Sequence, residues 1–198
     1  KSPLKEDMSL KSVSPYASTK IIIENLINDY SYSNPKFHAI SLRYFNPIGA
    51  DSKSGLYDKP LGEPQNLMPL IIRSIKENKV FKVFGNDYPT KDGTCIRDYI
   101  HVKDLASAHL EAFQKLSKIK GHISINLGLG KGASVFEIIS LFEKVNKTKL
   151  KYVITKRRKG DSAVSYANNQ KAKSILKWKP KYSYIDMVRD AWQAESKK

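Results

Sequence analysis

The sequence predicts an α/β protein, because short strand-like segments alternate with longer helix-like segments along the whole chain. Of the 198 residues, 40% are hydrophobic, which is enough to bury a sizeable core, and no internal repeat is visible. The expected strands are 37–44, 80–84, 96–100, 123–127 and 151–154. The expected helices are 15–30, 67–77, 104–116, 135–145, 169–176 and 185–194.

Local signals along the chain support these elements. Ser14 is a suitable N-cap and Pro15 fits the first helical position, so a helix is expected to begin there. Residues 37–44 alternate between apolar and polar side chains, as a strand does, and residues 45–49 contain Asn, Pro and Gly, which favour a loop. The Gly- and Pro-rich segments 50–65 and 85–93 are expected to be loops as well. Ser183-x-x-Asp186 is a capping-box pattern that predicts the start of the last helix.

The chain is strongly basic, with a formal net charge of +16. Such a charge suits a nucleic-acid partner. However, 29 of the 35 basic residues are Lys, and they are spread along the chain rather than interleaved with aromatic residues. A solvated, Lys-rich surface is therefore expected, with no nucleic-acid partner.

The apolar residues and the cysteine count predict a soluble, cytoplasmic protein. No apolar run approaches 18 residues and the start has no apolar signal region, so no membrane span is expected. The single cysteine, Cys95, offers no disulfide framework, which indicates a reducing compartment. Cys95 has no evident base or metal partner, so we expect a small, buried, apolar residue there.

Tyr16 and Lys20 are four residues apart on the first expected helix and therefore share one face. A phenol can act as a general base near neutral pH only when nearby positive charge stabilises the phenolate, and Lys20 can supply part of that charge. The pair Tyr-x-x-x-Lys also occurs often by chance on helix surfaces. The motifs that follow decide between these interpretations.

Several long motifs follow in a fixed order. They are Arg43-Tyr44-Phe45-Asn46-Pro47-Ile48-Gly49-Ala50, Asn66-Leu67-Met68-Pro69, Gly85-Asn86-Asp87-Tyr88-Pro89-Thr90-x-Asp92-Gly93-Thr94 and Arg97-Asp98-Tyr99-Ile100-His101-Val102-x-Asp104-Leu105. With Tyr16 and Lys20, these motifs resemble the UDP-glucose (UDP-galactose) 4-epimerases of the extended short-chain dehydrogenase/reductase superfamily. The resemblance runs from Ser14 to about Trp192.

The resemblance implies part of a Rossmann-type parallel sheet plus a smaller α/β substrate-binding lobe. Residues 1–50 would be the C-terminal part of the NAD-binding domain. Residues 51–198 would be mainly the UDP-sugar lobe, with some segments that return to the sheet. The implied cofactor is NAD, and no metal is implied.

The resemblance also implies roles for individual residues. Tyr16 would take the proton from the sugar 4-hydroxyl while hydride moves from C4 to NAD, and the 4-keto sugar would rotate before the hydride returns. Lys20 would bind the nicotinamide ribose, with Tyr44 and Pro47 near the nicotinamide. The implied UDP-sugar contacts are the diphosphate ligands Arg97 and Arg158, the ribose acceptor Asp161, the pocket aromatics Phe84 and Tyr99, and Asn46, Asn66, Leu67 and Val135. His101 and Asp104 are expected to be structural.

Ser165 corresponds to a position beside the 2-substituent of the sugar. In the family, a bulky Tyr there accompanies UDP-glucose and UDP-galactose only, whereas a small residue also admits the N-acetylated UDP-sugars. Ser165 therefore predicts a bifunctional enzyme, unless Tyr166 is the residue that faces the sugar.

The chain departs from the family in its first part. The family has a Gly-rich NAD-binding half of roughly 130 residues, which this sequence lacks. The family also has a catalytic Ser or Thr upstream of the tyrosine, and its position would fall before Lys1. Gly128-x-Gly130-x-x-Ala133 fits a dinucleotide fingerprint, but residues 150–157 hold no acidic residue at the expected spacing, so that reading is rejected. The isolated chain is therefore expected to be inactive.

The family implies a homodimer built partly on the helix of Tyr16, or else a separate chain that supplies the NAD-binding half. The apolar surplus at 21–23, 26 and 27 is consistent with either a dimer contact or burial under that half. Two alternatives remain: a nucleotide-sugar dehydratase or decarboxylase of the same superfamily, and a non-catalytic remnant that binds nucleotide sugars or nucleic acid.

Overall fold

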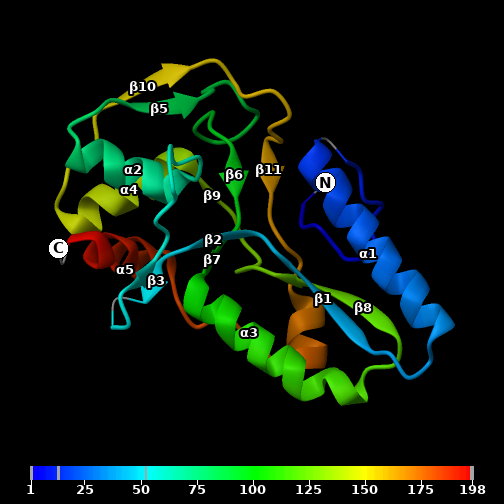
Figure 1. The fold of residues 1–198 in the computed structure, drawn as a ribbon. Coiled ribbons are helices and arrows are strands. Elements are labelled where there is room, and N and C mark those ends of the chain that lie inside the picture. Colours follow the sequence, from blue (N-terminus) through cyan, green and yellow to red (C-terminus); the bar gives the residue numbers. More distant parts are fainter. Residues whose placement is uncertain (1, 13, 52, 197–198) are drawn as a thin grey trace.

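The computed structural model describes residues 2–12, 14–51 and 53–196. Figure 1 shows two groups of elements that are joined by short strands in the middle of the molecule. One group contains a parallel pair, β1 (Ala39–Tyr44) and β8 (His122–Leu127), which lie side by side with Ala39 opposite His122. Helices α1 (Pro15–Ser33) and α3 (Val102–Lys115) cover this pair.

The two faces of the β1–β8 pair differ in polarity. Alternate residues, Ile40, Leu42, Ile123, Ile125 and Leu127, pack in one cluster with α3 and with a short π-helical turn, η2 (Ala172–Leu176). The residues between them, Ser41, Arg43, Ser124 and Asn126, form hydrogen bonds on the α1 side. The hydrophobic core of this group therefore lies on the α3 face, and the α1 face is polar.

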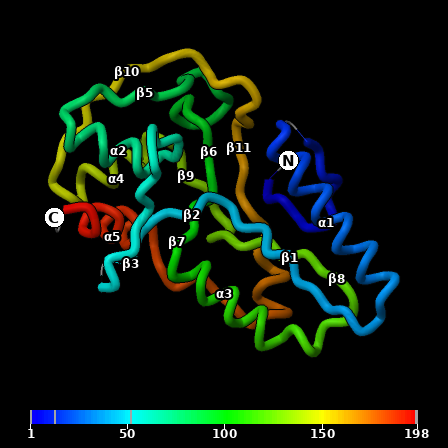
Figure 2. The backbone as a smooth tube through the Cα atoms, viewed as in Figure 1, coloured from blue at the N-terminus to red at the C-terminus, as the bar shows by residue number. Residues whose placement is uncertain are grey.

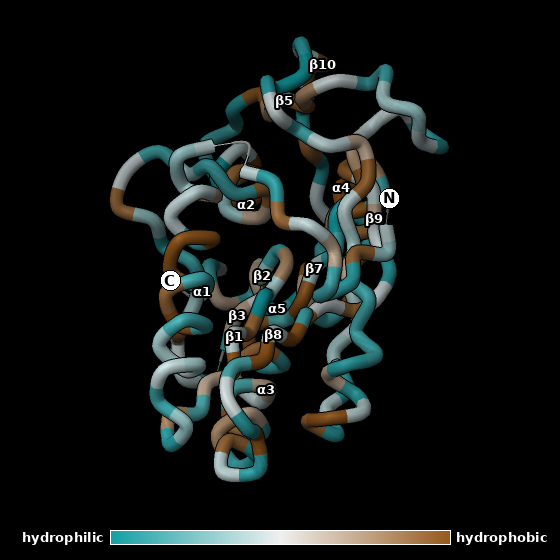
Figure 3. The backbone as a smooth tube through the Cα atoms, turned by 90° about the vertical axis from the view of Figure 1, so that its right-hand side faces the viewer, coloured by the Kyte–Doolittle hydropathy of each residue, from teal (hydrophilic) through white to brown (hydrophobic). Residues whose placement is uncertain are grey.

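The second group has a core of its own. Helices α2 (Leu67–Lys76), α4 (Val135–Asn146) and α5 (Tyr184–Ser196) pack against the parallel pair β5 (Phe81–Phe84) and β10 (Tyr152–Thr155). Its largest fully buried side chains include Ile71, Ile138, Phe142 and Met187. Figure 2 follows the backbone between the groups, and Figure 3 shows hydrophobic stretches around β1 and β8 and hydrophilic loops beside β10.

Short strands connect the two groups. Their bounds are β2 (Asn46–Ile48), β3 (Ala50–Asp51), β4 (Leu56–Tyr57), β6 (Ile96–Arg97), β7 (Tyr99–His101), β9 (Ala133–Ser134) and β11 (Val164–Ser165). Among the described strands, β2 pairs with β7 and β11 with β6 in parallel, whereas β6–β9 and β3–β4 are antiparallel. A 3-10 turn, η1 (Leu116–Lys118), extends α3. No helix of the described residues is long and apolar enough to cross a membrane.

The predicted helix starts are confirmed. The Ser14 side chain accepts from the backbone N–H of Ala17, with Pro15 at the first helical position. Ser183 and Asp186 bond reciprocally at the start of α5. The structure adds a capping box that was not predicted from the sequence, between Ser134 and Glu137 at the start of α4.

The structure also corrects some expectations. Residues 45–49 were expected to be a loop, but residues 46–48 form β2, because β7 supplies a partner more than 50 residues away in the sequence. The expected strand 96–100 is two short strands, β6 and β7, which separate at Asp98 and pair with different partners. The expected helix 169–176 is helical from residue 170, with residues 172–176 in the π-helical turn η2. The expected loop 50–65 contains the β3–β4 pair.

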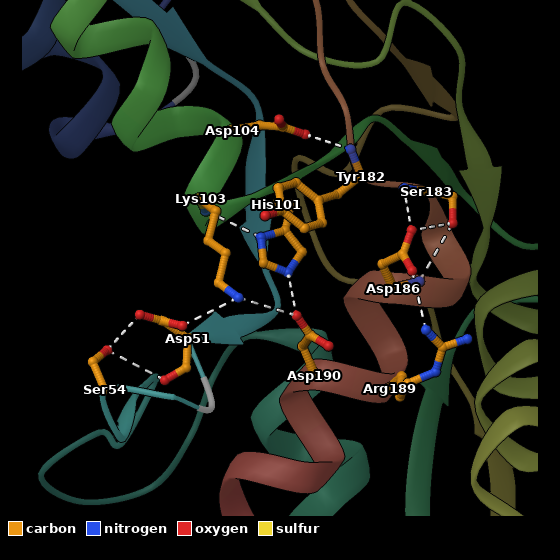
Figure 4. Close-up of polar contacts among 10 residues, drawn as sticks. All are labelled: Asp51, Ser54, His101, Lys103, Asp104, Tyr182, Ser183, Asp186, Arg189 and Asp190. Atoms are coloured by element: carbon orange, nitrogen blue, oxygen red, sulfur yellow. Dashed lines mark hydrogen bonds and ion pairs between the residues drawn. The ribbon is translucent and has the colours of Figure 1, made fainter.

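Figure 4 shows the polar contacts around His101, at the end of β7. His101 is fully buried, its Nδ1 accepts from the backbone N–H of Lys103, and its Nε2 lies 3.3 Å from Asp190 Oδ2. Burial lowers the pKa of this imidazole. Asp104 accepts from the backbone N–H groups of Lys181 and Tyr182. Both residues are therefore structural, as the sequence predicts, and they tie α3 to the segment before α5.

Asp98 connects the loop after β8 with the segment after β11. Its fully buried carboxylate accepts from the backbone N–H groups of Leu129, Gly130 and Ala167, at 2.8 to 3.1 Å. The backbone carbonyl of Asp98 accepts from the N–H of Asn46, and its backbone N–H donates to the carbonyl of Ser165. A Cβ at Gly128 would lie 2.4 Å from Asp98 Oδ2, so only glycine allows this approach. Burial raises the pKa of the carboxyl, and the three N–H donors oppose that effect.

We predict that Asp98→Ala lowers the free energy of unfolding by about 3 kcal/mol or more, because it leaves three buried N–H groups without an acceptor. Asp98→Asn keeps one carbonyl acceptor and should cost less. Urea unfolding of the chain measures both, with the exposed Asp29→Ala as control. A loss no larger for Asp98→Ala than for Asp29→Ala would show that Asp98 does not hold these segments together.

Candidate functional site

A cleft of about 330 Å³ lies where the second group of elements meets the connecting strands. It is bounded by β2, the start of α2, strands β5 to β7, the start of α4 and the loop before β11. Ten of the residues predicted from the sequence line it: Asn46, Pro47, Asn66, Leu67, Phe84, Arg97, Tyr99, Val135, Arg158 and Asp161. Residues far apart in the sequence therefore converge on one concave site.

Two guanidinium groups converge on one carboxylate in this cleft. Arg97 Nη2 lies 3.4 Å from Asp161 Oδ1, and Arg158 Nε donates to Asp161 Oδ2 at 3.1 Å. Arg97 is also held by the carbonyl oxygens of Ile96 and Ser162. The Arg158 side chain is half exposed and lies 5.0 Å from the Phe84 ring centroid. Arg97 is thus fixed in place, whereas Arg158 can turn towards a ligand.

The N-terminal ends of two helices, α2 and α4, also line the cleft. Leu67 and Val135 are the first residues of α2 and α4. The backbone N–H of Val135 already donates to Thr94 Oγ1 at 3.1 Å. The N-cap of α2, Asn66, forms no side-chain capping hydrogen bond. The start of α2 therefore presents N–H groups and the positive end of a helix dipole to the cleft, and both favour an anion.

The loop 85–93 lies between Phe84 and Cys95 in the sequence, and both of these residues line the cleft. Arg157 Nε donates to Asp87 Oδ1 at 2.6 Å, and its guanidinium lies 4.1 Å from the Tyr88 ring centroid. This arginine holds the pKa of the Asp87 carboxyl below its usual range. Asp92 accepts from Thr94 and from Ser134, which connects the same loop to the start of α4. The wall that carries Phe84 and Arg158 is therefore braced from both ends.

Tyr16 and Lys20 form the expected pair on α1. Lys20 Nζ lies 5.2 Å from the Tyr16 ring centroid, and the Tyr16 residue is 73% exposed. Neither residue lines the cleft. The pair is thus formed and accessible on α1.

The NAD dependent epimerase/dehydratase family profile matches residues 1–128. The chain belongs to this family.

The relatives of this epimerase/dehydratase chain are longer than the chain itself. UDP-glucose 4-epimerase of Erwinia amylovora is 43% identical over 93% of this chain and 55% of that protein. The solved UDP-glucose-4-epimerase of Stenotrophomonas maltophila, with bound NAD and formylated UDP-arabinopyranose, is 41% identical with a TM-score of 0.95, over 98% of this chain and 58% of that one. The enzyme of Bifidobacterium longum, in complex with NAD+ and UDP, is 36% identical with a TM-score of 0.93, over 100% and 59%. The chain thus spans a little over half the length of these relatives.

Two further predicted site residues of this epimerase/dehydratase chain lie outside the cleft lining. Tyr44, at the end of β1, is half exposed and lies 6.4 Å from the His109 ring. Ser165 lies opposite Arg97 in the β11–β6 pair and is half-buried. Because successive residues of a strand face opposite sides, Ser165 and Tyr166 point in opposite directions.

Backbone groups of the Gly128–Ala133 loop are already hydrogen-bonded within this chain. The amides of Leu129 and Gly130 both donate to Asp98, and the Gly128 carbonyl accepts from Asn169 Nδ2. These donors are not available to a pyrophosphate. The loop is therefore a structural element, which agrees with the rejected fingerprint.

Several cleft residues were not predicted from the sequence. They are Ile48, Gln65, Leu70, Phe81, Lys82, Val83 and Cys95. The strand pattern of 80–84 could have indicated the residues beside Phe84. Cys95 is buried, as expected, but it also lines the cleft, and burial raises the pKa of its thiol. Within the described residues there is no group of three or more His, Cys, Asp or Glu side chains that could hold a metal ion.

Proposed function

We propose that this chain is the substrate-binding and proton-transferring part of a UDP-glucose 4-epimerase. The enzyme would interconvert UDP-glucose and UDP-galactose. The main support for this proposal is the cleft, which is lined by ten of the expected residues. Among them, Arg97 and Arg158 both contact the carboxylate of Asp161. The relatives named above support the same activity.

The cleft suits a nucleoside diphosphate for physical reasons. Planar guanidinium groups bind phosphate oxygens in a bidentate manner, and the uncapped start of α2 adds backbone N–H donors. Arg158 would leave Asp161 for the diphosphate, and the Asp161 carboxylate would then accept from a ribose hydroxyl. Phe84, Tyr99 and Leu67 supply the apolar walls for the uridine end.

Tyr16 would remove the proton of the sugar 4-hydroxyl and return it. Lys20 places its ammonium beside the phenol, which stabilises the phenolate. NAD, when bound, would accept the hydride from C4 and return it to the other face of the sugar.

The described residues fit the nicotinamide end of NAD, since Tyr16 and Lys20 are paired and accessible and Tyr44 is half exposed. They do not offer a site for its diphosphate, because the amides of the Gly128–Ala133 loop are taken by Asp98. We therefore propose that the region of the relatives that this chain does not match supplies that site, and that the isolated chain is inactive.

The same proposal covers domains and assembly. Residues 1–50 would belong to the NAD-binding domain and residues 51–198 mainly to the sugar lobe. Among the described strands, β1 pairs on one edge only, and α1 exposes Ile22, Ile23 and Leu26. These features support a homodimer, or association with a separate chain that carries the NAD-binding half. A cytoplasmic location is proposed from the single cysteine alone.

We predict that Tyr16→Phe in the native polypeptide that carries this chain lowers kcat for UDP-galactose by about 10²- to 10⁴-fold, because the proton acceptor is lost. A coupled assay for UDP-glucose, with NAD present, measures the effect. Tyr32→Phe removes an 89% exposed hydroxyl from the same helix and is the control. Equal turnover by the Tyr16→Phe and Tyr32→Phe proteins would contradict the proposed role of Tyr16.

We also propose that the small Ser165 admits UDP-N-acetylglucosamine. Ser165→Tyr should lower kcat/KM for this sugar about tenfold or more while largely sparing UDP-glucose, because a phenol ring would fill the space that the N-acetyl group needs. The two substrates are compared on the same preparations, with Tyr166→Phe as the neighbouring control. A similar loss on both sugars, or no turnover of the acetylated sugar before substitution, would remove this role for Ser165.

A further inference from the structure

One residue of helix α1, Glu24, forms hydrogen bonds to both strands of the β1–β8 pair. Arg43 of β1 donates to both carboxylate oxygens of Glu24, and the Nε–Oε2 distance is 3.0 Å. Ser124 of β8 donates to Oε1 at 2.7 Å. The carboxylate of Glu24 thus contacts both strands of the β1–β8 pair.

Arg43 continues this network to the segment that precedes α1. Its Nη1 donates to the backbone carbonyl of Glu6 at 3.1 Å, and the Glu6 carboxylate accepts from the backbone N–H of Asn126. Leu4, in the same segment, forms a parallel bridge with Ala167. Glu24 therefore connects α1 to the sheet, and Arg43 connects the sheet to the segment of Leu4 and Glu6. That segment in turn contacts Ala167, which follows Ser165.

The Glu24–Arg43 pair is shielded and well formed. The side chains are 18% and 22% exposed, respectively. Arg43 keeps the pKa of the Glu24 carboxyl below its usual value, against the opposing effect of burial. His122, which also lines the groove beside Glu24, has its pKa lowered by burial and bonds to Ser41. A forked guanidinium–carboxylate contact restrains direction as well as distance.

Apolar packing does little to orient α1 within the described chain. Ser31 is its one fully buried residue, and Ile22, Ile23, Leu26 and Tyr30 are all about half exposed. The sheet face beneath it is polar. The rotation of α1 about its axis therefore depends on the directional contacts of Glu24.

We propose that Glu24 and Arg43 are positioning residues that set the rotation and height of α1, and thereby place Tyr16 and Lys20 for proton transfer. Glu24 is one turn beyond Lys20 and about 12 Å along the helix axis from Tyr16. A misplacement of a reacting group by 1 Å can cost about a hundredfold in rate. The catalytic part of this inference rests on the proposed epimerase function.

The placement of α1 is measured on the chain itself, without any need for activity. Nitroxide labels at Thr19 on α1 and Gln114 on α3, in a Cys95→Ala background, report the distance across the sheet by electron resonance. Glu24→Gln and Arg43→Lys should shift or broaden the distance distribution, because each keeps the size of the side chain but loses the forked ion pair. Ser124→Ala, a milder change, should shift it in the same direction. Asp29→Asn, on the same helix without a side-chain contact among the described interactions, is the control and should leave the distribution unchanged.

The kinetic consequence is measured in the native polypeptide. Glu24→Gln and Arg43→Lys should lower kcat for UDP-galactose about tenfold to a hundredfold with KM unchanged, and Asp29→Asn should change neither. Unchanged distances in both variants, or shifted distances with an unchanged kcat, would overturn the inference. No turnover by the unsubstituted polypeptide would overturn the proposed function instead, and the label distances would still decide whether Glu24 orients α1.

Discussion

The buried carboxylate of Asp98 is the contact on which the arrangement of the two groups depends. It accepts N–H bonds from the loop after β8 and from the segment after β11, while its own backbone bonds to the start of β2 and to β11. An uncompensated buried charge is costly, so the carboxylate is stable only when all these segments are in place. Arg97 and Tyr99, the neighbours of Asp98 in the sequence, both line the cleft. The contacts of Asp98 therefore help to place two residues of the cleft lining.

The two sets of functional residues rest on different kinds of support. The cleft is braced by Asp98, by the Arg157–Asp87 contact and by the packed core of α2, α4 and α5. The Tyr16–Lys20 pair is carried by a helix with exposed apolar residues and a polar underside. The proposed nucleotide site is thus supported within the described chain, whereas we propose that the placement of Tyr16, the proposed proton acceptor, depends on Glu24.

Much of this could be predicted from the sequence where the signal is local. The caps at Ser14 and Ser183, the strand at β8 and the helices α2 to α5 follow from residue type and spacing. The ten cleft residues were predicted from the family resemblance, not from residue type and spacing alone. Strand β2 could not be predicted, because Asn46 and Pro47 favour loops and its partner β7 is remote in the sequence. The roles of Asp98 and Glu24 were missed for the same reason: a lone acidic residue carries no local sign of the distant N–H or guanidinium groups that it will meet.

The central claim is that the cleft lined by the second group and the connecting strands binds a nucleoside diphosphate. A crystal structure of the chain with UDP tests it most directly. The account predicts the diphosphate between the start of α2 and the guanidinium groups of Arg97 and Arg158, the uracil near Phe84, and Arg158 released from Asp161. UDP bound instead in the polar groove between α1 and η2, lined by Glu24, His122 and Lys171, would contradict it.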